Sequence, residues 1–99
     1  MTTIDQQFGD LSSEATANLE KYTHYFNFNI LLSAYANYMQ ATQGDNTAPE
    51  AEVTRGKEYY KWRAWKLLEG KSTDDAKRDY VDILTRMNNE LAECECEEM

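Results

Sequence analysis

The chain has 99 residues, of which 41% are hydrophobic, and a formal net charge of −8 at pH 7. This length allows one domain with a single modest core, and no apolar run approaches the roughly 18 residues that a membrane-spanning helix needs. The acidic balance argues against general nucleic-acid binding, which needs a basic face. Half of the basic residues nevertheless lie between Arg55 and Lys66, which favours a discrete anionic small molecule as ligand.

The first half of the chain carries two apolar stripes at helical spacing. The first stripe consists of Ile4, Phe8, Leu11, Ala15 and Tyr22, and the second of Leu31, Leu32, Tyr35, Tyr38 and Met39. An aromatic segment separates the stripes, and either Asn27 or Asn29 is a candidate N-cap for the second helix. We expect the second helix to end at Gly44, because glycine suits the left-handed residue beyond a helix C-terminus.

The second half predicts a loop and two further helices. Residues 46–53 have no stripe and form the one long loop, a position that often borders a site. A third helix is expected from Thr54 to Glu69, with Trp62 and Trp65 partly in the core. A fourth helix begins after a Ser72 cap and carries an inner stripe: Ala76, Tyr80, Ile83, Leu84, Met87 and Leu91. The fold class predicted is all-α, a bundle of four helices.

The last residues differ in composition from the rest. Five glutamates fall within the final ten residues. We therefore predict a domain over residues 4–91 and an acidic, disordered C-terminal tail over residues 92–99.

Two clusters suggest the chemistry of a ligand. Tyr35 and Tyr38 are three residues apart on one helix, so both rings can face the same side and stack on a flat aromatic group. Lys57 and Lys61 are four residues apart and can supply charge-assisted hydrogen bonds to phosphate. The pattern predicts a ligand that is partly aromatic, partly phosphorylated and partly apolar.

The order of these motifs resembles the acyl-CoA-binding protein family. The resemblance runs without a net gap from about Leu31 to Leu84. It is carried by Tyr35-x-x-Tyr38-x-Gln40-Ala41-Thr42-x-Gly44-Asp45, by Lys61-Trp62-x-Ala64-Trp65, and by Leu68, Gly70, Ser72, Asp75-Ala76 and Tyr80. It implies an up-down four-helix bundle that binds medium- to long-chain acyl-CoA esters and acts as an intracellular carrier and pool former for them, without catalysis.

The resemblance also implies roles for individual residues. Tyr35 and Tyr38 would contact the adenine and the ribose 3′-phosphate, Lys57 and Lys61 would bind phosphates, and Tyr80 would close over the ligand. The family lysine that follows the second tyrosine is Met39 in this chain, which predicts weaker but real binding. Three basic residues are candidates to replace that lysine: Lys21, Arg55 and Arg63. A further basic position on the family's first helix aligns with Glu20.

The remaining expectations concern the acyl chain, catalysis and partners. Candidate residues for lining the acyl chain are Phe8, Leu11, Ala15, Leu31, Leu32 and Met39. No catalytic or metal-ligating group is expected, because His24 is the only histidine and the motifs of common enzymes are absent. We expect no cofactor besides the acyl-CoA ligand, no nucleic-acid partner, no stable membrane insertion, transient contact with acyl-CoA-using enzymes, and a monomer.

The N-terminal and C-terminal residues bear on where the protein is located and whether it is modified. Residues 1–8 lack the basic start and apolar core of a secretory signal, so we expect a cytoplasmic protein. The end Cys96-Glu97-Glu98-Met99 has the outline of a prenylation box, but its two central glutamates disfavour lipidation. Cys94 and Cys96 give only a weak signal for a metal.

Two other functions compete with acyl-CoA binding. A small helical protein-interaction module would use the tyrosine and tryptophan clusters as core and docking surface. A general binder of lipids or fatty acids would not need Lys57 and Lys61.

Overall fold

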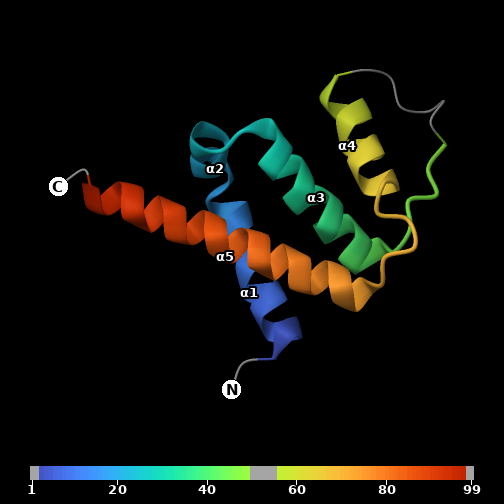
Figure 1. Ribbon diagram of the computed structural model, residues 1–99, viewed down its shortest axis with the longest axis horizontal. Coiled ribbons are helices and arrows are strands. Elements are labelled where there is room, and N and C mark those ends of the chain that lie inside the picture. The colour runs from blue at the N-terminus through green and yellow to red at the C-terminus, as the bar shows by residue number, and fades with distance from the viewer. Residues whose placement is uncertain (1–2, 50–55, 98–99) are drawn as a thin grey trace.

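The computed structural model describes residues 3–49 and 56–97, with side chains up to residue 93. This part of the chain forms α-helices and no strand, which confirms the all-α class. The helices are α1 (Ile4–Ala17), α2 (Leu19–Tyr25), α3 (Phe28–Gln43), α4 (Lys57–Lys66) and α5 (Thr73–Glu97) (Figure 1). Within the described ranges, no helix is both long enough and apolar enough to span a bilayer.

The first predicted helix is divided in two at Asn18. Asn18 leaves helical geometry at φ −105° and ψ 12°, although its backbone N–H still donates to the Glu14 carbonyl. Its own carbonyl then accepts from the N–H of Tyr22, so α2 begins without a loop. The stripe continues across the break, because Phe8 and Tyr22 are both buried. Four expected helices therefore become five without a change of the inward face.

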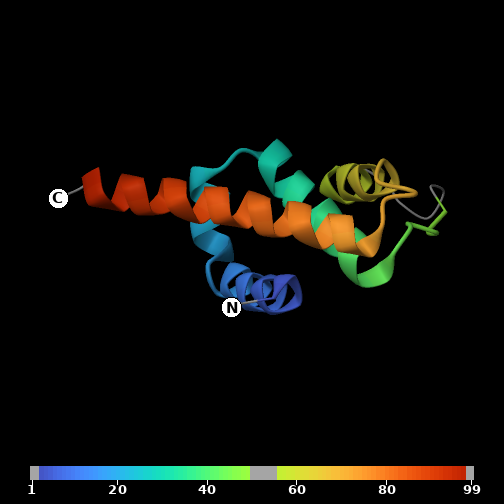
Figure 2. The same cartoon turned by 60° about the horizontal axis from the view of Figure 1, so that its bottom comes forward.

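Helix α5 lies at the centre of the bundle. It packs against α1 and against α3, and α3 also packs against α4. Figure 2 shows α1 on one side of α5 and α3 with α4 on the other. The inner stripe of α5 is buried as predicted, except Ile83, which is half-buried; the buried members are Ala76, Tyr80, Leu84, Met87 and Leu91.

The caps of α3 and α5 follow the predicted residues. The Asn27 side chain accepts a hydrogen bond from the N–H of Ile30 at 3.0 Å, so Asn27 caps α3. Gly44 ends that helix with φ 79°. The Ser72 hydroxyl accepts from the N–H of Asp75 at 3.1 Å and caps α5.

Hydrogen bonds of the Gln40 and Asp45 side chains connect the end of α3 to the turn between α4 and α5. Gln40 is 1% exposed, and its amide donates to Asp45 Oδ1 and to the Lys71 carbonyl, both at 2.8 Å. Asp45 Oδ1 also accepts from the N–H of Gly70 at 2.9 Å. These two side chains therefore have a structural role that explains their place beside the tyrosine pair.

The two tryptophans hold the segment after α3 against α4. The indole N–H of Trp65 donates to the Gly44 carbonyl at 2.8 Å, and that of Trp62 donates to the Ala48 carbonyl at 2.7 Å. In return, Asn46 donates to the Trp62 carbonyl at 3.0 Å. Both indoles are half-buried, as expected from their pattern.

Two element boundaries differ from the expected ones. Helix α4 covers Lys57–Lys66, shorter than the predicted range, and residues 67–70 form turns instead. Part of the predicted loop and the start of that helix lie in residues 50–55, outside the described residues. Helix α5 extends through Glu97, where a disordered tail was predicted, because glutamate is a good helix former and continues the last buried turn around Leu91. The predictions about the Cys94 and Cys96 side chains lie outside the described side chains.

The Asp45 contacts give a pH-dependent prediction. The hydrogen bonds from Gly70 and Gln40 lower the pKa of the Asp45 carboxyl, so its ionised form stabilises the fold. The stability that the ionised Asp45 adds is fully present above the pKa of this carboxyl in the unfolded chain, about 3.9. It is lost as the pH falls through the lower pKa that the carboxyl has in the folded protein. We predict that Asp45→Ala lowers the unfolding temperature at pH 7, and that the difference from the parent narrows in acid.

Thermal unfolding at a series of pH values measures this effect. Asp10→Ala removes an exposed carboxylate of α1 and is the matched control, which should change the unfolding temperature little. Equal unfolding temperatures for Asp45→Ala and the parent at pH 7 would show that the contacts do not stabilise the fold.

Candidate functional site

A pocket of about 530 Å³ lies among α1, α2, α3 and α5. This volume falls within the range of small-molecule sites, which is about 300–1,000 Å³. Three small hydroxyl side chains of α1 contribute to its lining, together with apolar and tyrosine side chains of the other helices. The lining residues are Ser12, Ser13, Ala15, Thr16, Leu19, Tyr22, Leu31, Ala34, Tyr35, Tyr38, Tyr80, Leu84 and Met87.

The pocket brings together five of the residues predicted for the site. They are Ala15, Leu31, Tyr35, Tyr38 and Tyr80. Side chains from three separate helices therefore meet around one space.

Lys61 of α4 does not line the pocket itself but lies against one of its tyrosines. Its ammonium lies 4.7 Å from the centroid of the Tyr35 ring, a cation–π arrangement. The ammonium also lies 3.8 Å from the Glu58 carboxylate one turn earlier. Burial, and then the Glu58 charge, raise the pKa of the Tyr35 phenol. The arrangement places one cation beside a neutral aromatic side chain of the pocket.

Other predicted residues do not line this pocket. Lys57 is exposed on the first turn of α4, and Leu11 packs against the core. Leu32 and Met39 are half-buried on α3, outside the lining. Phe8 is 9% exposed and lies in the core, in contact with the rings of Tyr38 and Tyr80.

Phe8, Tyr38 and Tyr80 form an aromatic triad. The centroid of the Phe8 ring lies 5.8 Å from that of Tyr38 and 5.0 Å from that of Tyr80, and the two tyrosine centroids are 5.8 Å apart. Burial raises the pKa of the Tyr80 phenol to about 12. Tyr38 is 38% exposed, so it presents one side to the pocket and solvent while the other two rings fix its orientation.

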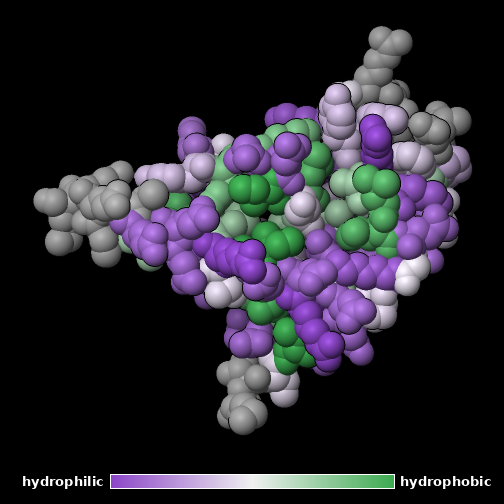
Figure 3. Space-filling view, viewed as in Figure 1, coloured by the Kyte–Doolittle hydropathy of each residue, from purple (hydrophilic) through white to green (hydrophobic). Residues whose placement is uncertain are grey.

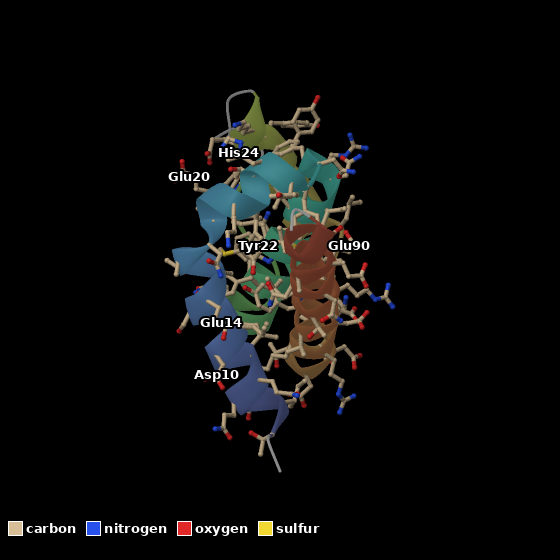
Figure 4. The ribbon with its side chains drawn as sticks, turned by 90° about the vertical axis from the view of Figure 1, so that its left-hand side faces the viewer. Asp10, Glu14, Glu20, Tyr22, His24 and Glu90 are labelled. Carbon is tan, nitrogen blue, oxygen red and sulfur yellow. The ribbon has the colours of Figure 1, made fainter. Side chains whose placement is uncertain are left out.

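Tyr22 is a pocket residue that the sequence pattern assigned only to a helix face. It is 2% exposed, and its hydroxyl donates to the Asn88 side-chain oxygen of α5. Burial is the main reason that the pKa of its phenol is raised. Figure 4 shows Tyr22 between α2 and α5, whereas Asp10, Glu14, Glu20 and His24 lie on the outer side of α1 and α2. The sequence indicated that Tyr22 turns inward, because it belongs to the first stripe. It did not indicate which residues Tyr22 would contact.

Neither Lys21 nor Arg63, two of the candidates to replace the missing lysine, is among the residues that line the pocket. Lys21 and Arg63 are exposed on α2 and α4, and Arg55 lies outside the described residues. In the part of the chain that is described, no three His, Cys, Asp or Glu side chains gather to hold a metal ion. What the described site offers chemically is therefore an apolar space with three hydroxyl groups of α1, tyrosine faces, and the ammonium of Lys61 against Tyr35.

Comparison with known proteins identifies the family. The family model described as "Acyl CoA binding protein" matches residues 5–84. The chain is 42% identical to the Acyl-CoA-binding protein of Saccharomyces cerevisiae over 57 residues, which are 58% of this chain and 66% of that protein. It is 49% identical to the Acyl-CoA-binding protein of Brassica napus over 51 residues, which are 52% of this chain and 55% of that protein. The match thus spans between about half and two thirds of these relatives' length.

A solved structure agrees with the fold. The crystal structure of Oryza sativa Acyl-CoA-Binding Protein 2 superposes with a TM-score of 0.78 at 28% identity, and the match covers 91% of this chain and 96% of that one. This likeness confirms the predicted type of helical bundle. With a family model that matches most of its length, this chain belongs to the acyl-CoA-binding protein family.

Proposed function

We propose that this protein binds medium- to long-chain acyl-CoA esters and carries them as an intracellular pool, without catalysing a reaction. The observation that supports this most is the placement of Lys61 over Tyr35 beside an apolar pocket. An acyl-CoA ester is apolar at one end and carries phosphates and a purine at the other. The names of the relatives point to the same ligand.

The acyl chain is assigned to the interior of the pocket. Leu31, Ala34, Leu84 and Met87 give this space an apolar lining contributed by α3 and α5. Each methylene group that leaves water for such a surface contributes about 0.8 kcal/mol. Much of the affinity therefore comes from the acyl chain, and free coenzyme A should bind more weakly than its long-chain esters.

The nucleotide end is assigned to the side of the pocket that faces α4. Tyr35 and Tyr38 offer ring faces for the purine, and Lys61 offers an ammonium for a phosphate. Lys57 lies one helical turn before Lys61 on α4 and is exposed, so it can turn towards a second phosphate when the ligand is bound. Tyr80 contacts Tyr38 and contributes to the pocket floor.

The other parts of the proposal follow from this ligand. Neither catalysis nor a cofactor is needed to hold an amphiphilic ester away from water. We infer a cytoplasmic monomer that meets acyl-CoA-using enzymes transiently and neither binds nucleic acid nor inserts stably into membranes. The net charge of −8 supports the inference about nucleic acid.

A comparison of three ligands tests the proposal. In titration calorimetry, palmitoyl-CoA should bind more tightly than both free coenzyme A and palmitate, because only the ester uses both ends of the site. Lys61→Ala should weaken palmitoyl-CoA binding by about tenfold or more, since one charge-assisted hydrogen bond contributes about 1.5–3 kcal/mol. The same substitution should leave palmitate binding unchanged.

Arg78→Ala is the matched control for this series. Arg78 is an exposed cation of α5 that pairs with Asp75 at the surface, so its loss changes the net charge without touching the pocket. Tight binding of palmitate, with the same affinity in Lys61→Ala as in the parent protein, would favour a general lipid binder. No heat with any of the three ligands would favour a protein-interaction module.

Met39→Lys tests the effect of the departure from the family pattern. Restoring the cation should raise the affinity for palmitoyl-CoA by about 10- to 100-fold, the equivalent of about 1.5–3 kcal/mol. Asn29→Lys adds the same charge at an exposed position of α3 and serves as the control. An equal affinity in Met39→Lys and the parent protein would show that position 39 does not reach the nucleotide.

A further inference from the structure

A second cavity of about 320 Å³ lies between α3 and α5. Its apolar lining is Phe26, Ile30, Ile83 and Met87, and no residue of α1 contributes among those described. The first pocket, in contrast, has α1 along one side. Figure 3 shows the face on which α5 passes in front of α1, with apolar atoms visible between α5 and the helices α2 and α3. The two spaces therefore lie on different sides of the contact between α3 and α5.

Met87 separates the two cavities, because it lines both. Its side chain is 3% exposed. Tyr22 lines the first cavity and Phe26 the second, and their ring centroids are 6.0 Å apart in an edge-to-face contact. Figure 4 shows Tyr22 between Glu14 on one side and Glu90, at the rim of the second cavity, on the other. Met87 and the Tyr22–Phe26 pair thus lie where the two cavities adjoin, within the contact between α3 and α5.

A methionine partition can move at low cost. Methionine is unbranched, has three rotatable side-chain bonds and adapts to irregular spaces. The aromatic pair is held more firmly, because the Tyr22 hydroxyl is hydrogen-bonded to Asn88. Met87 is therefore the lining residue best able to move between the first pocket and a space more than half as large.

We propose that the second cavity takes the far end of an acyl chain that is too long for the first pocket, and that Met87 determines this chain-length range. The inference rests on the proposed function. The three polar residues that line the second cavity, Ser33, Arg86 and Glu90, are all exposed, so their polar groups can stay in water, and Arg86 is paired with Asp82 at 3.3 Å. The remaining surface suits the methyl end of an acyl chain.

The proposal has a measurable consequence for chain length. With the first pocket alone, the last methylene groups of a very long chain stay in water and the affinity stops rising. With both cavities, each further buried methylene adds to the affinity, and two of them are worth about tenfold. Lignoceroyl-CoA should therefore bind at least about tenfold more tightly than palmitoyl-CoA.

Isoleucine methyl groups report directly on the second cavity. The chain has three isoleucines, and Ile30 and Ile83 both line this cavity while Ile4 lies at the start of α1. In NMR spectra of the isotopically labelled full chain, saturating lignoceroyl-CoA should shift the Ile30 and Ile83 methyl signals and leave that of Ile4 unchanged. Palmitoyl-CoA should shift them much less. Unchanged Ile30 and Ile83 signals with bound lignoceroyl-CoA would overturn the proposal.

Two substitutions test the same point by calorimetry. Ser33→Phe fills the second cavity from an exposed position, so it should remove the tenfold preference for lignoceroyl-CoA and leave palmitoyl-CoA binding unchanged. Thr85→Phe makes a similar change at an exposed position of α5 that lines neither cavity, and should keep the preference. Met87→Ile keeps the bulk but stiffens the partition, and should also lose the preference.

The outcomes separate the two levels of the proposal. A preference that persists in both Ser33→Phe and Met87→Ile would contradict a role for the second cavity while acyl-CoA binding stands. Absence of binding by palmitoyl-CoA to the parent protein would instead remove the proposed function itself.

Discussion

The contact of three aromatic rings is the interaction on which the site depends. Phe8, Tyr38 and Tyr80 come from α1, α3 and α5, and their centroids lie 5.0–5.8 Å apart. Aromatic pairs contribute about 0.5–1.5 kcal/mol each beyond the burial of their surface. Because the triad joins three helices at one point, it fixes α1 beside α5 and leaves the pocket open farther along the bundle. An ion pair between Asp5 and Lys77, at 2.8 Å, ties the same end of α1 to α5.

A second, separate set of bonds sets the position of the cation. The indoles of Trp62 and Trp65 and the amide of Asn46 tie the segment after α3 to α4 through backbone carbonyls. Helix α4 is thereby held along α3 with Lys61 over Tyr35. The triad thus sets one end of the apolar pocket, and the bonds between the segment after α3 and α4 set the ammonium. The diagnostic motifs therefore combine residues that hold the helices together with residues at the pocket.

The local features of the fold were predictable from the sequence, whereas the neighbours of each side chain were not. The spacing of apolar residues predicted which faces of the helices turn inward. Asn27, Gly44 and Ser72 marked three of the helix ends. The break at Asn18 was missed because neither proline nor glycine marks it. The helix through Glu97 was missed because a run of glutamates indicates a solvated surface and does not exclude a helix.

The same limit applies to the site. A stripe shows which face turns inward, but the crossing of two helices decides whether a residue lines a pocket or lies behind it. Phe8 was expected along the acyl chain, and the structure places its ring in the core against Tyr38, outside the lining of the pocket. Tyr22 and Met87 were assigned to inner faces without a role, because the partition they help to form arises only when α2, α3 and α5 are packed together.

The central claim is that one pocket holds the acyl chain while α4 supplies the cation for a phosphate. A crystal structure of the full chain with palmitoyl-CoA tests it most directly. We expect acyl carbons in contact with Leu31, Ala34 and Leu84, and a phosphate oxygen within hydrogen-bonding distance of the Lys61 ammonium. An acyl chain outside this pocket, or phosphates that contact no residue of α4, would contradict it.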